Sequence, residues 1–182
     1  NFNIPGKFKK SIILIGNFDG LHSGHQKLFE LAKKYKKKYK SKVGVVTFDP
    51  IPKMFFNTKI KNYRISNFNQ KVIYLKKFGV DFVINKKFDK NFSKIAYYKF
   101  IKDILSKKLR SKFIFVSNNF RFGHKREGDV AQLKKYENDF GYNLINPAPL
   151  MKNKKIISST IIRKLLEEGK ISKANTFLKR NW

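Results

Sequence analysis

The stretch Ser11–His25, which reads SIILIGNFDGLHSGH, decides the fold. Its first five residues form an apolar run that Gly16 ends, and this pattern predicts a short strand buried on both faces. A glycine-containing loop follows. From Gln26 to Lys40, apolar side chains then recur at the spacing of a helix. The segment is therefore a strand, a loop and a helix, which is the first unit of an α/β sheet.

The rest of the chain repeats this alternation. Further strands are predicted for residues 43–48, 81–84, 112–116 and 142–146. Helices are predicted over Gln70–Phe78, Ser93–Leu105, Val130–Phe140, Thr160–Glu168 and Ser172–Phe177, whereas Met54–Asn69 is predicted to be a loop. Strands that alternate with helices indicate a mostly parallel sheet flanked by helices, and we expect one such α/β domain over residues 1–182.

The composition excludes several classes of protein. A hydrophobic fraction of 41%, with 19 Phe and 8 Tyr, excludes disorder over most of the 182 residues. The absence of cysteine excludes a disulfide scaffold, a thiolate zinc site and a cysteine nucleophile. No apolar run is long enough for a membrane span, and the first residues lack the apolar core of a secretory signal. We therefore expect a soluble, cytoplasmic protein.

The charge is extreme, because 42 Lys and Arg stand against 12 Asp and Glu, which gives a net charge of +30. Such a balance is typical of proteins that bind nucleic acid or another polyanion. Only six of the 42 are Arg, however, and surfaces that read bases or grip phosphates favour Arg. Lys, Asn, Ile and Phe are abundant together, as an AT-rich coding sequence produces. Compositional drift is the preferred explanation, and a polyanion partner is the alternative.

In a parallel α/β sheet, ligands bind at the carboxyl ends of the strands. The loop Gly16–His25 lies at such an end and is neither a Walker A loop nor a GxGxxG loop. His22 and His25 stand three residues apart at the start of a helix, so they face the same way. Gly24 lacks a Cβ, which lets a phosphate approach the backbone amides. We predict phosphate contact here. A metal site lacks a carboxylate at ligand spacing, and a purely structural role is the other alternative.

Two more segments are candidates for ligand binding at the carboxyl ends of the strands. In ISSTIIR, residues 157–163, hydroxyls open a helix and Arg163 can reach back over its N-terminus, so the segment is either an anion site or an ordinary helix cap. The loop Val116–Asp129 mixes aromatic and cationic residues after a strand. It either stacks a planar ring beside a phosphate or is a surface loop held by its Phe residues.

These motifs carry a resemblance. GNFDGLHSGHQ, TFDPIP, VSNNFRFGHKREGD, ISSTIIRKLLEEG and LKRNW resemble, in the same order, the adenylyltransferase module of the prokaryotic bifunctional riboflavin kinase/FAD synthetase family, from Ser11 to Trp182. The resemblance implies a Rossmann-like nucleotidylyltransferase fold. It also implies that the chain transfers the AMP moiety of ATP to the phosphate of FMN, which gives FAD and pyrophosphate.

The resemblance also implies roles for individual residues. His22, His25 and Arg163 match catalytic positions, and the residues expected to contact ATP are Gly16, Phe18, His22, Gly24, His25, Ser158, Ser159, Thr160 and Arg163. Those expected to contact FMN are Asp49, Pro50, Asn119, Phe120 and Arg121. Magnesium is expected to accompany ATP, with no protein ligands of its own. Two residues depart from the family pattern on the flavin side: Ser117 replaces the usual Gly, and Ile51 replaces the usual His.

The match ends where the family's riboflavin kinase module begins. We therefore expect a riboflavin kinase domain C-terminal to this chain in the full-length protein, and no specific nucleic-acid or membrane partner. Two alternatives stay open. A lysine-rich nucleic-acid-binding module without catalysis explains the charge but leaves HSGH and ISSTIIR unexplained. A nucleotidylyltransferase with another phosphate acceptor keeps the chemistry, but the FRFGHKREGD segment argues against it.

Overall fold

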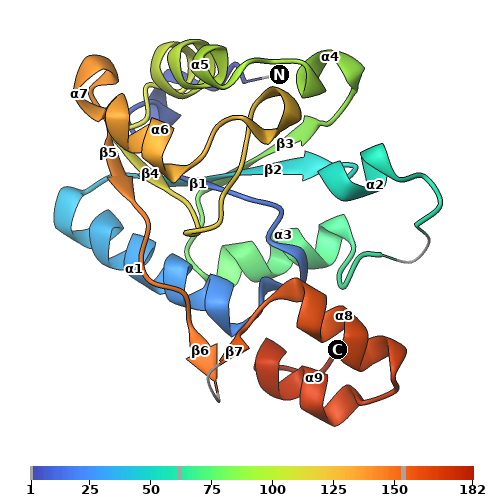
Figure 1. Ribbon diagram of the computed structural model, residues 1–182. Helices are drawn as coiled ribbons and strands as arrows, with labels where there is room; N and C mark the ends of the chain where they lie inside the picture. The colour runs from blue at the N-terminus through green and yellow to red at the C-terminus, as the bar shows by residue number, and fades with distance from the viewer. Residues whose placement is uncertain (1, 61–62, 153–154) are drawn as a thin grey trace.

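The structure is a computed structural model that describes residues 2–60, 63–152 and 155–182. Its centre is a parallel five-stranded sheet in the order β3-β2-β1-β4-β5 (Figure 1). The strands are β1 Ile12–Ile15, β2 Val43–Asp49, β3 Phe82–Lys87, β4 Phe113–Phe115 and β5 Asn143–Ile145. The order changes direction at β1, which has β2 on one side and β4 on the other. The expected parallel α/β sheet is confirmed, and β1 lies at its switch point.

The four residues of β1 are all buried, as the apolar run predicts. Ile13 and Ile15 belong to the cluster on one face of the sheet, and Ile12 and Leu14 belong to the cluster on the other face. Successive side chains of a strand point to opposite faces, so a continuous apolar run serves both layers. This burial fixes the position of the loop that follows β1.

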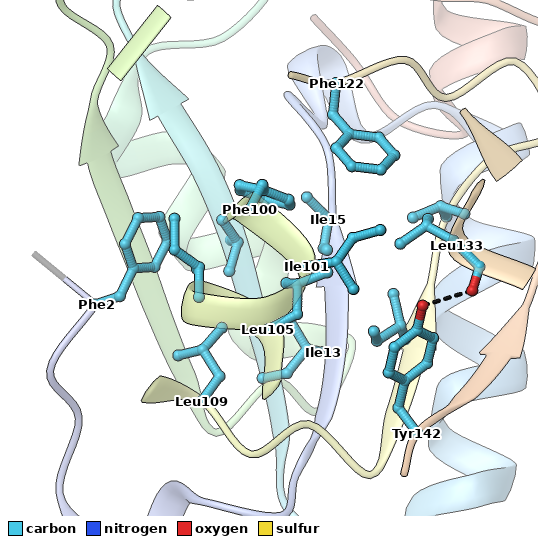
Figure 2. Packing of buried hydrophobic residues seen from close by; sticks show 14 of the residues in the cluster. Phe2, Ile13, Ile15, Phe100, Ile101, Leu105, Leu109, Phe122, Leu133 and Tyr142 are labelled. Carbon is cyan, nitrogen blue, oxygen red and sulfur yellow. Dashed lines mark hydrogen bonds between the residues drawn. The ribbon is translucent and has the colours of Figure 1, made fainter. Parts of the chain in front are cut away.

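Helices cover both faces of the sheet (Figure 1). On one face lie α1, Ser23–Tyr39, and α3, Phe68–Lys77. On the other lie α4 Lys90–Ser93, α5 Tyr97–Lys99, the π-helical segment Phe100–Lys108, α6 Val130–Lys135 and α7 Glu137–Phe140. Figure 2 shows the apolar packing on this second face, where the hydroxyl of Tyr142 donates a hydrogen bond to the carbonyl of Leu133. The core therefore buries this polar group with a partner.

After β5 the chain leaves the sheet. A small antiparallel pair, β6 Met151–Lys152 and β7 Lys155–Ile156, leads to α8 Ser159–Glu167 and α9 Ile171–Leu178. These two helices pack on each other through Ile162, Leu165 and Leu178, with Ile65 in the same cluster. The paired strands β6 and β7 were not predicted. Among the residues that the structure describes, no helix is long and apolar enough to cross a lipid bilayer.

Several predicted boundaries differ from the structure. The predicted loop Met54–Asn69 overlaps a short helix, α2 Pro52–Phe56, and the start of α3; its residues 61 and 62 lie outside the described chain. Proline suits the first turn of α2 because it has no N–H to leave unpaired there. Asn67 and Gln70 form a reciprocal capping box, which starts α3 before the predicted position.

Three helix predictions were wrong in detail. Ser93 was expected to begin a helix, but it ends α4, whose cap is Asp89 accepting the N–H of Phe92. The helix predicted over Val130–Phe140 breaks at Tyr136 into α6 and α7. Ser172 lies inside α9 instead of capping it, because the N-terminal position is taken by Lys170.

Candidate active site

A cavity of about 550 Å³ opens at the carboxyl ends of the central strands. Residues directly after β1, β4 and β5 line it, together with the start of α8. All the residues expected to contact ATP are among its lining: Gly16, Phe18, His22, Gly24, His25, Ser158, Ser159, Thr160 and Arg163. The structure thus brings together two segments that are more than a hundred residues apart in the sequence.

The two histidines lie against each other at the start of α1. Their rings are stacked, with centroids 3.7 Å apart and planes 21° apart. His22 is the N-cap residue, and its Nδ1 accepts the backbone N–H of His25 at 3.4 Å. Because Nδ1 acts as an acceptor, the proton of a neutral His22 ring must be on Nε2. His22 can therefore donate one hydrogen bond from Nε2.

Both rings are neutral at pH 7. Burial lowers the pKa of His22 to about 4, although the nearby Asp19 carboxylate acts in the opposite direction. Burial also holds the pKa of His25 well below its usual value, helped by the charges of Lys71 and Arg163 and by His22. The pair therefore presents neutral imidazoles, not cations, at the cavity.

Two buried polar atoms of the cavity wall lack partners. Within the described part of the chain, neither Nδ1 of His25 nor Oδ1 of Asn17 has a hydrogen-bond partner. Both residues line the cavity. An unpaired buried polar atom costs free energy, so such atoms at a cavity are typical of groups that pair with a ligand. Asn17 was not among the predicted site residues.

Gly24 and Phe18 support the loop that carries the two histidines. A Cβ on Gly24 would lie 3.2 Å from the ring of His22 and 3.3 Å from the carbonyl oxygen of Ile157. The glycine therefore lets the start of α1 approach the second segment closely, and protein atoms occupy the space that was expected to admit a phosphate. Phe18, only 3% exposed, packs edge-on against His25 and supports its ring.

The second segment is tied to the first by hydrogen bonds. Ser158 caps α8, with its Oγ accepting the N–H of Ile161. The Oγ of Ser159 donates to the carbonyl of Asp19 at 3.0 Å, and Thr160 is exposed on the cavity wall. The cap that was the ordinary explanation of Ser158 is thus present, and Ser159 has the different task of joining α8 to the loop after β1.

The guanidinium of Arg163 already has partners within the protein. Its Nη2 donates to Oδ2 of Asp19 at 2.7 Å, and its Nε donates to the carbonyl of Tyr63 at 2.7 Å. The guanidinium also stacks 3.7 Å above the ring of Tyr63. Arg163 therefore lies at the cavity in a fixed orientation.

Asp19 organises this part of the site. It is 2% exposed and accepts the N–H groups of Ile65 and Ser66 in addition to Arg163. Asp19 was not among the predicted site residues. Its signal in the sequence was that one of only twelve acidic residues stands in a tight loop between Phe18 and Gly20. Lys71, which is buried on α3 and donates to the carbonyl of Asn17 at 2.8 Å, was not predicted either.

The third segment, residues 116–129, also contributes residues to the cavity lining. Asn119, Phe120 and Arg121, which were predicted to contact FMN, line the cavity. Ser117, at the position that departs from the family pattern, donates from Oγ to Oδ1 of Asn119 at 2.9 Å. The Arg121 guanidinium forms an ion pair with Asp129 at 2.7 Å. The segment is therefore an ordered loop held by its own polar contacts.

The other expected flavin contacts lie elsewhere. Asp49 and Pro50 are not among the cavity lining, and the carboxylate of Asp49 forms an ion pair with Arg64. Their neighbours on both sides, Phe48 and Ile51, line the cavity instead. The departure at Ile51 thus places a side chain that is 3% exposed, without polar atoms, at the flavin-side wall.

The closing motif LKRNW braces the loop after β1. Nη2 of Arg180 donates to the carbonyl of Gly20 at 2.8 Å, and Nε1 of Trp182 donates to the carbonyl of Ile65 at 2.8 Å. Gln26 on α1 completes the contact by donating to the carbonyl of Leu178 at 2.9 Å. The last residues of the chain therefore support the site without lining it.

Comparison with known proteins agrees with this geometry. Residues 5–161 match the family model described as FAD synthetase. The bifunctional riboflavin kinase/FMN adenylyltransferases of Buchnera aphidicola subsp. Acyrthosiphon pisum and of Escherichia coli K12 are 40% and 35% identical to the chain, over 98% and 92% of its length. The chain spans 57% and 53% of these two relatives, a little over half of each.

A solved structure has the same fold. It is titled as a macrolide-efflux protein from Streptococcus pneumoniae, and it superposes with a TM-score of 0.85 at 27% identity, covering 98% of this chain and 66% of that one. The parallel sheet with β1 at its switch point and the cavity at its carboxyl edge fit a fold of the nucleotidylyltransferase type. With a family model that matches most of its length, the chain belongs to the FAD synthetase family.

Proposed function

We propose that this chain transfers the AMP moiety of ATP to the phosphate of FMN, giving FAD and pyrophosphate. The observation that carries the proposal is the meeting of the HSGH, ISSTIIR and FRFG segments around one cavity. Membership of the FAD synthetase family supports it, as do the printed names of the relatives. A nucleic-acid-binding module would not need these three segments at one edge of the sheet.

The reaction needs no protein nucleophile. An oxygen of the FMN phosphate attacks the α-phosphorus of ATP, the new P–O bond joins the two nucleotides, and the bond from the α-phosphorus to the bridging oxygen breaks. The electron pair leaves with pyrophosphate. Since the FMN phosphate is already an anion at neutral pH, the protein contributes alignment and stabilisation of the developing charge.

The histidine pair supplies neutral donors in this proposal. Nε2 of His22 carries the proton because Nδ1 is an acceptor, so it can donate to a phosphoryl oxygen. His25, stacked against it, has an unpaired Nδ1 that can pair with the ligand or with its water. Neutral donors strengthen as charge develops and do not have to release a bound proton to the leaving group.

Arg163 and the N-terminus of α8 hold the β- and γ-phosphates. The backbone N–H groups of Ser159 and Thr160 lie in the first turn of a nine-residue helix, where free amides favour anions. Arg163 adds a fork of donors beside them, and its Nη1 has no hydrogen bond to any other residue that the structure describes. In this proposal, Asn119, Phe120 and Arg121 of the cavity lining contact FMN.

Magnesium enters the proposal as part of the substrate Mg·ATP. Within residues 2–60, 63–152 and 155–182, no three side chains of His, Cys, Asp or Glu gather as a metal cluster. The described residues therefore offer no cluster of side chains that would hold a metal ion. A hard ion held by substrate phosphates and water needs none, and every step above is assigned to protein groups or substrates.

The same proposal covers the setting of the domain. The relatives are named as bifunctional, and the chain matches a little over half of each. We therefore keep residues 1–182 as an adenylyltransferase domain, with a riboflavin kinase domain C-terminal to it in the full-length protein. A cytoplasmic location follows from the proposed use of ATP as a substrate.

The direct test is product formation. Purified chain is incubated with FMN and Mg·ATP, and flavins and pyrophosphate are separated and measured. The proposal expects FAD and pyrophosphate in equal amounts. Parallel incubations with 4′-phosphopantetheine, in place of FMN, test the alternative acceptor. An adenylylated product from that acceptor and none from FMN would overturn the assignment to FMN.

A further inference from the structure

A lysine ammonium is buried behind the loop that carries the candidate active site. Lys71 on α3 is 4% exposed. Its Nζ donates to the carbonyl of Asn17 at 2.8 Å and to Oγ1 of Thr47 at 3.3 Å. Lysine is rarely so deeply buried unless its charge is paired, so this position calls for a physical reason.

No carboxylate in the described part of the chain makes an ion pair with Lys71. The two acids whose charges act on Lys71 have other partners: Asp19 forms an ion pair with Arg163, and Asp49 forms one with Arg64. Burial lowers the pKa of Lys71, although the charges of Asp19 and Asp49 act in the opposite direction. The structure therefore contains a buried positive charge that is only partly compensated, and such a charge is costly.

The charge lies next to the cavity without lining it. Asn17, which accepts from Lys71, is itself a lining residue, and its carbonyl is the contact between the two. The charge of Lys71 also acts on a second lining residue, because it is one of the causes that lower the pKa of His25. An anion in the cavity would supply the compensation that the protein does not.

We propose that Lys71 is a positioning residue of the phosphate site: it holds the Gly16–Asp19 loop through the Asn17 carbonyl, and its charge favours binding of the polyphosphate of ATP. The assignment rests on the proposed function. Lys71 does not touch substrate in this account. It acts through the loop and through its field, which is strong because the intervening medium is protein instead of water.

The first experiment measures binding of two probes, inorganic pyrophosphate and Mg·ATP, by calorimetric titration at fixed ionic strength. Lys71→Met removes the charge and keeps most of the length of the unbranched side chain. Lys76→Met removes one charge from the exposed side of the same helix and is the matched control. Lys71→Met should weaken both probes roughly tenfold, the scale of one unit charge acting through a partly buried site. Lys76→Met should bind as the wild type does.

The second experiment separates charge from packing. Imidazole titration by NMR should show a higher pKa for His25 in Lys71→Met, because one of the charges that lowers it is gone. The other charged groups that act on Lys71 or His25 are unchanged in this variant; they are Asp19, Asp49, Arg64 and Arg163. Lys71→Arg keeps the charge, so it should keep the low pKa of His25 and most of the affinity. A residue that only filled space would alter the unfolding temperature and leave the His25 pKa in place.

The outcomes are distinct. Lys71→Met with wild-type affinity and an unchanged His25 titration would overturn the role of Lys71 while leaving the proposed function intact. A wild-type chain that binds neither pyrophosphate nor Mg·ATP would instead contradict the proposed function. In that case the His25 titration still decides whether the charge of Lys71 acts on the cavity.

Discussion

Arg163 donates from Nη2 to Oδ2 of Asp19 across 2.7 Å, although 144 residues separate the two in the sequence. The side chains are 13% and 2% exposed. The bond connects the start of α8 to the loop after β1, which are two of the three segments around the cavity. The cavity therefore depends on an ion pair that water hardly reaches, and such a pair is far more sensitive to shape than a surface pair.

Arg163→Lys should weaken ATP binding or slow turnover and leave FMN affinity nearly unchanged. A lysine has no planar fork, so it cannot hold Asp19, the Tyr63 carbonyl and a phosphate at once. Calorimetric titration with each nucleotide measures the effect, and Lys164→Arg on the exposed side of the same helix is the control. Equal losses for ATP and FMN would remove Arg163 from the phosphate side.

His25→Ala should lower turnover by a factor on the order of 10²–10³ and have little effect on folding. This is the usual cost of losing one hydrogen-bond donor to the charge that develops in the transition state. His22→Ala should slow turnover similarly. The third histidine, His124, lies outside the cavity lining, with Nδ1 3.4 Å from the carbonyl of Ser93, so His124→Ala is the matched control. Steady-state kinetics and thermal unfolding of all three variants provide the comparison. Wild-type turnover in both the His22 and His25 variants would exclude the proposed roles.

The buried histidines should make the protein less stable in mild acid. The pKa of His22 is about 4 in the folded state and 6.5 when unperturbed, so between these values the unfolded chain binds a proton that the folded chain does not. The free energy of unfolding should therefore fall as the pH drops from 6.5 toward 4, by up to about 3 kcal/mol for this residue. Above that range, His22 should add no pH dependence to the stability.

Urea unfolding at a series of pH values measures this dependence. His22→Asn removes the titrating group, so its stability should change less between about pH 7 and pH 5, where carboxylates stay ionised. Parallel curves for the two proteins would show that His22 is not held neutral by burial.

The sheet could be predicted because its signals are local. Ile12–Ile15 is an apolar run without polar interruption, and a run of this kind has few alternatives to a central parallel strand. Helix ends were less predictable where a cap competes with a similar residue nearby: Asp89, not Ser93, caps α4. The paired strands β6 and β7 have only two residues each, which is too short for a periodic signal.

Site residues could be predicted where they stand in a continuous sequence motif. Residues that only the fold brings to the site could not. His22 and Arg163 stand in recognisable segments. Tyr63 does not, since its contact with Arg163 is made by a backbone carbonyl and a ring that only the fold brings near. Lys71 was hidden among many lysines. Its one signal was a position four residues before Leu75, on the buried face of α3.

The strong positive charge should produce only weak binding of nucleic acid. A second cavity, of about 1050 Å³, opens beside the residues that precede β1, β2 and β4, and seven lysines and Arg110 line it. This second cavity lies at the amino ends of the strands, whereas the candidate active site lies at their carboxyl ends. Binding there should be independent of base sequence and should fall steeply with salt, because it rests on counterion release.

Fluorescence anisotropy of labelled single-stranded RNA and DNA, titrated with the chain at rising salt, measures this binding. A complex with one sequence that stays tight at physiological ionic strength would overturn the explanation by compositional drift and favour a nucleic-acid partner.

In the proposed function, the chain holds one adenylyl-transfer site, and the acceptor must bring its own phosphate. The most direct measurement incubates the purified chain with Mg·ATP and either FMN or riboflavin, and separates the flavins by chromatography. We expect FAD from FMN and no product from riboflavin, because riboflavin lacks the phosphate that attacks the α-phosphorus. No FAD from FMN, in a folded chain that binds both substrates, would contradict the proposed function.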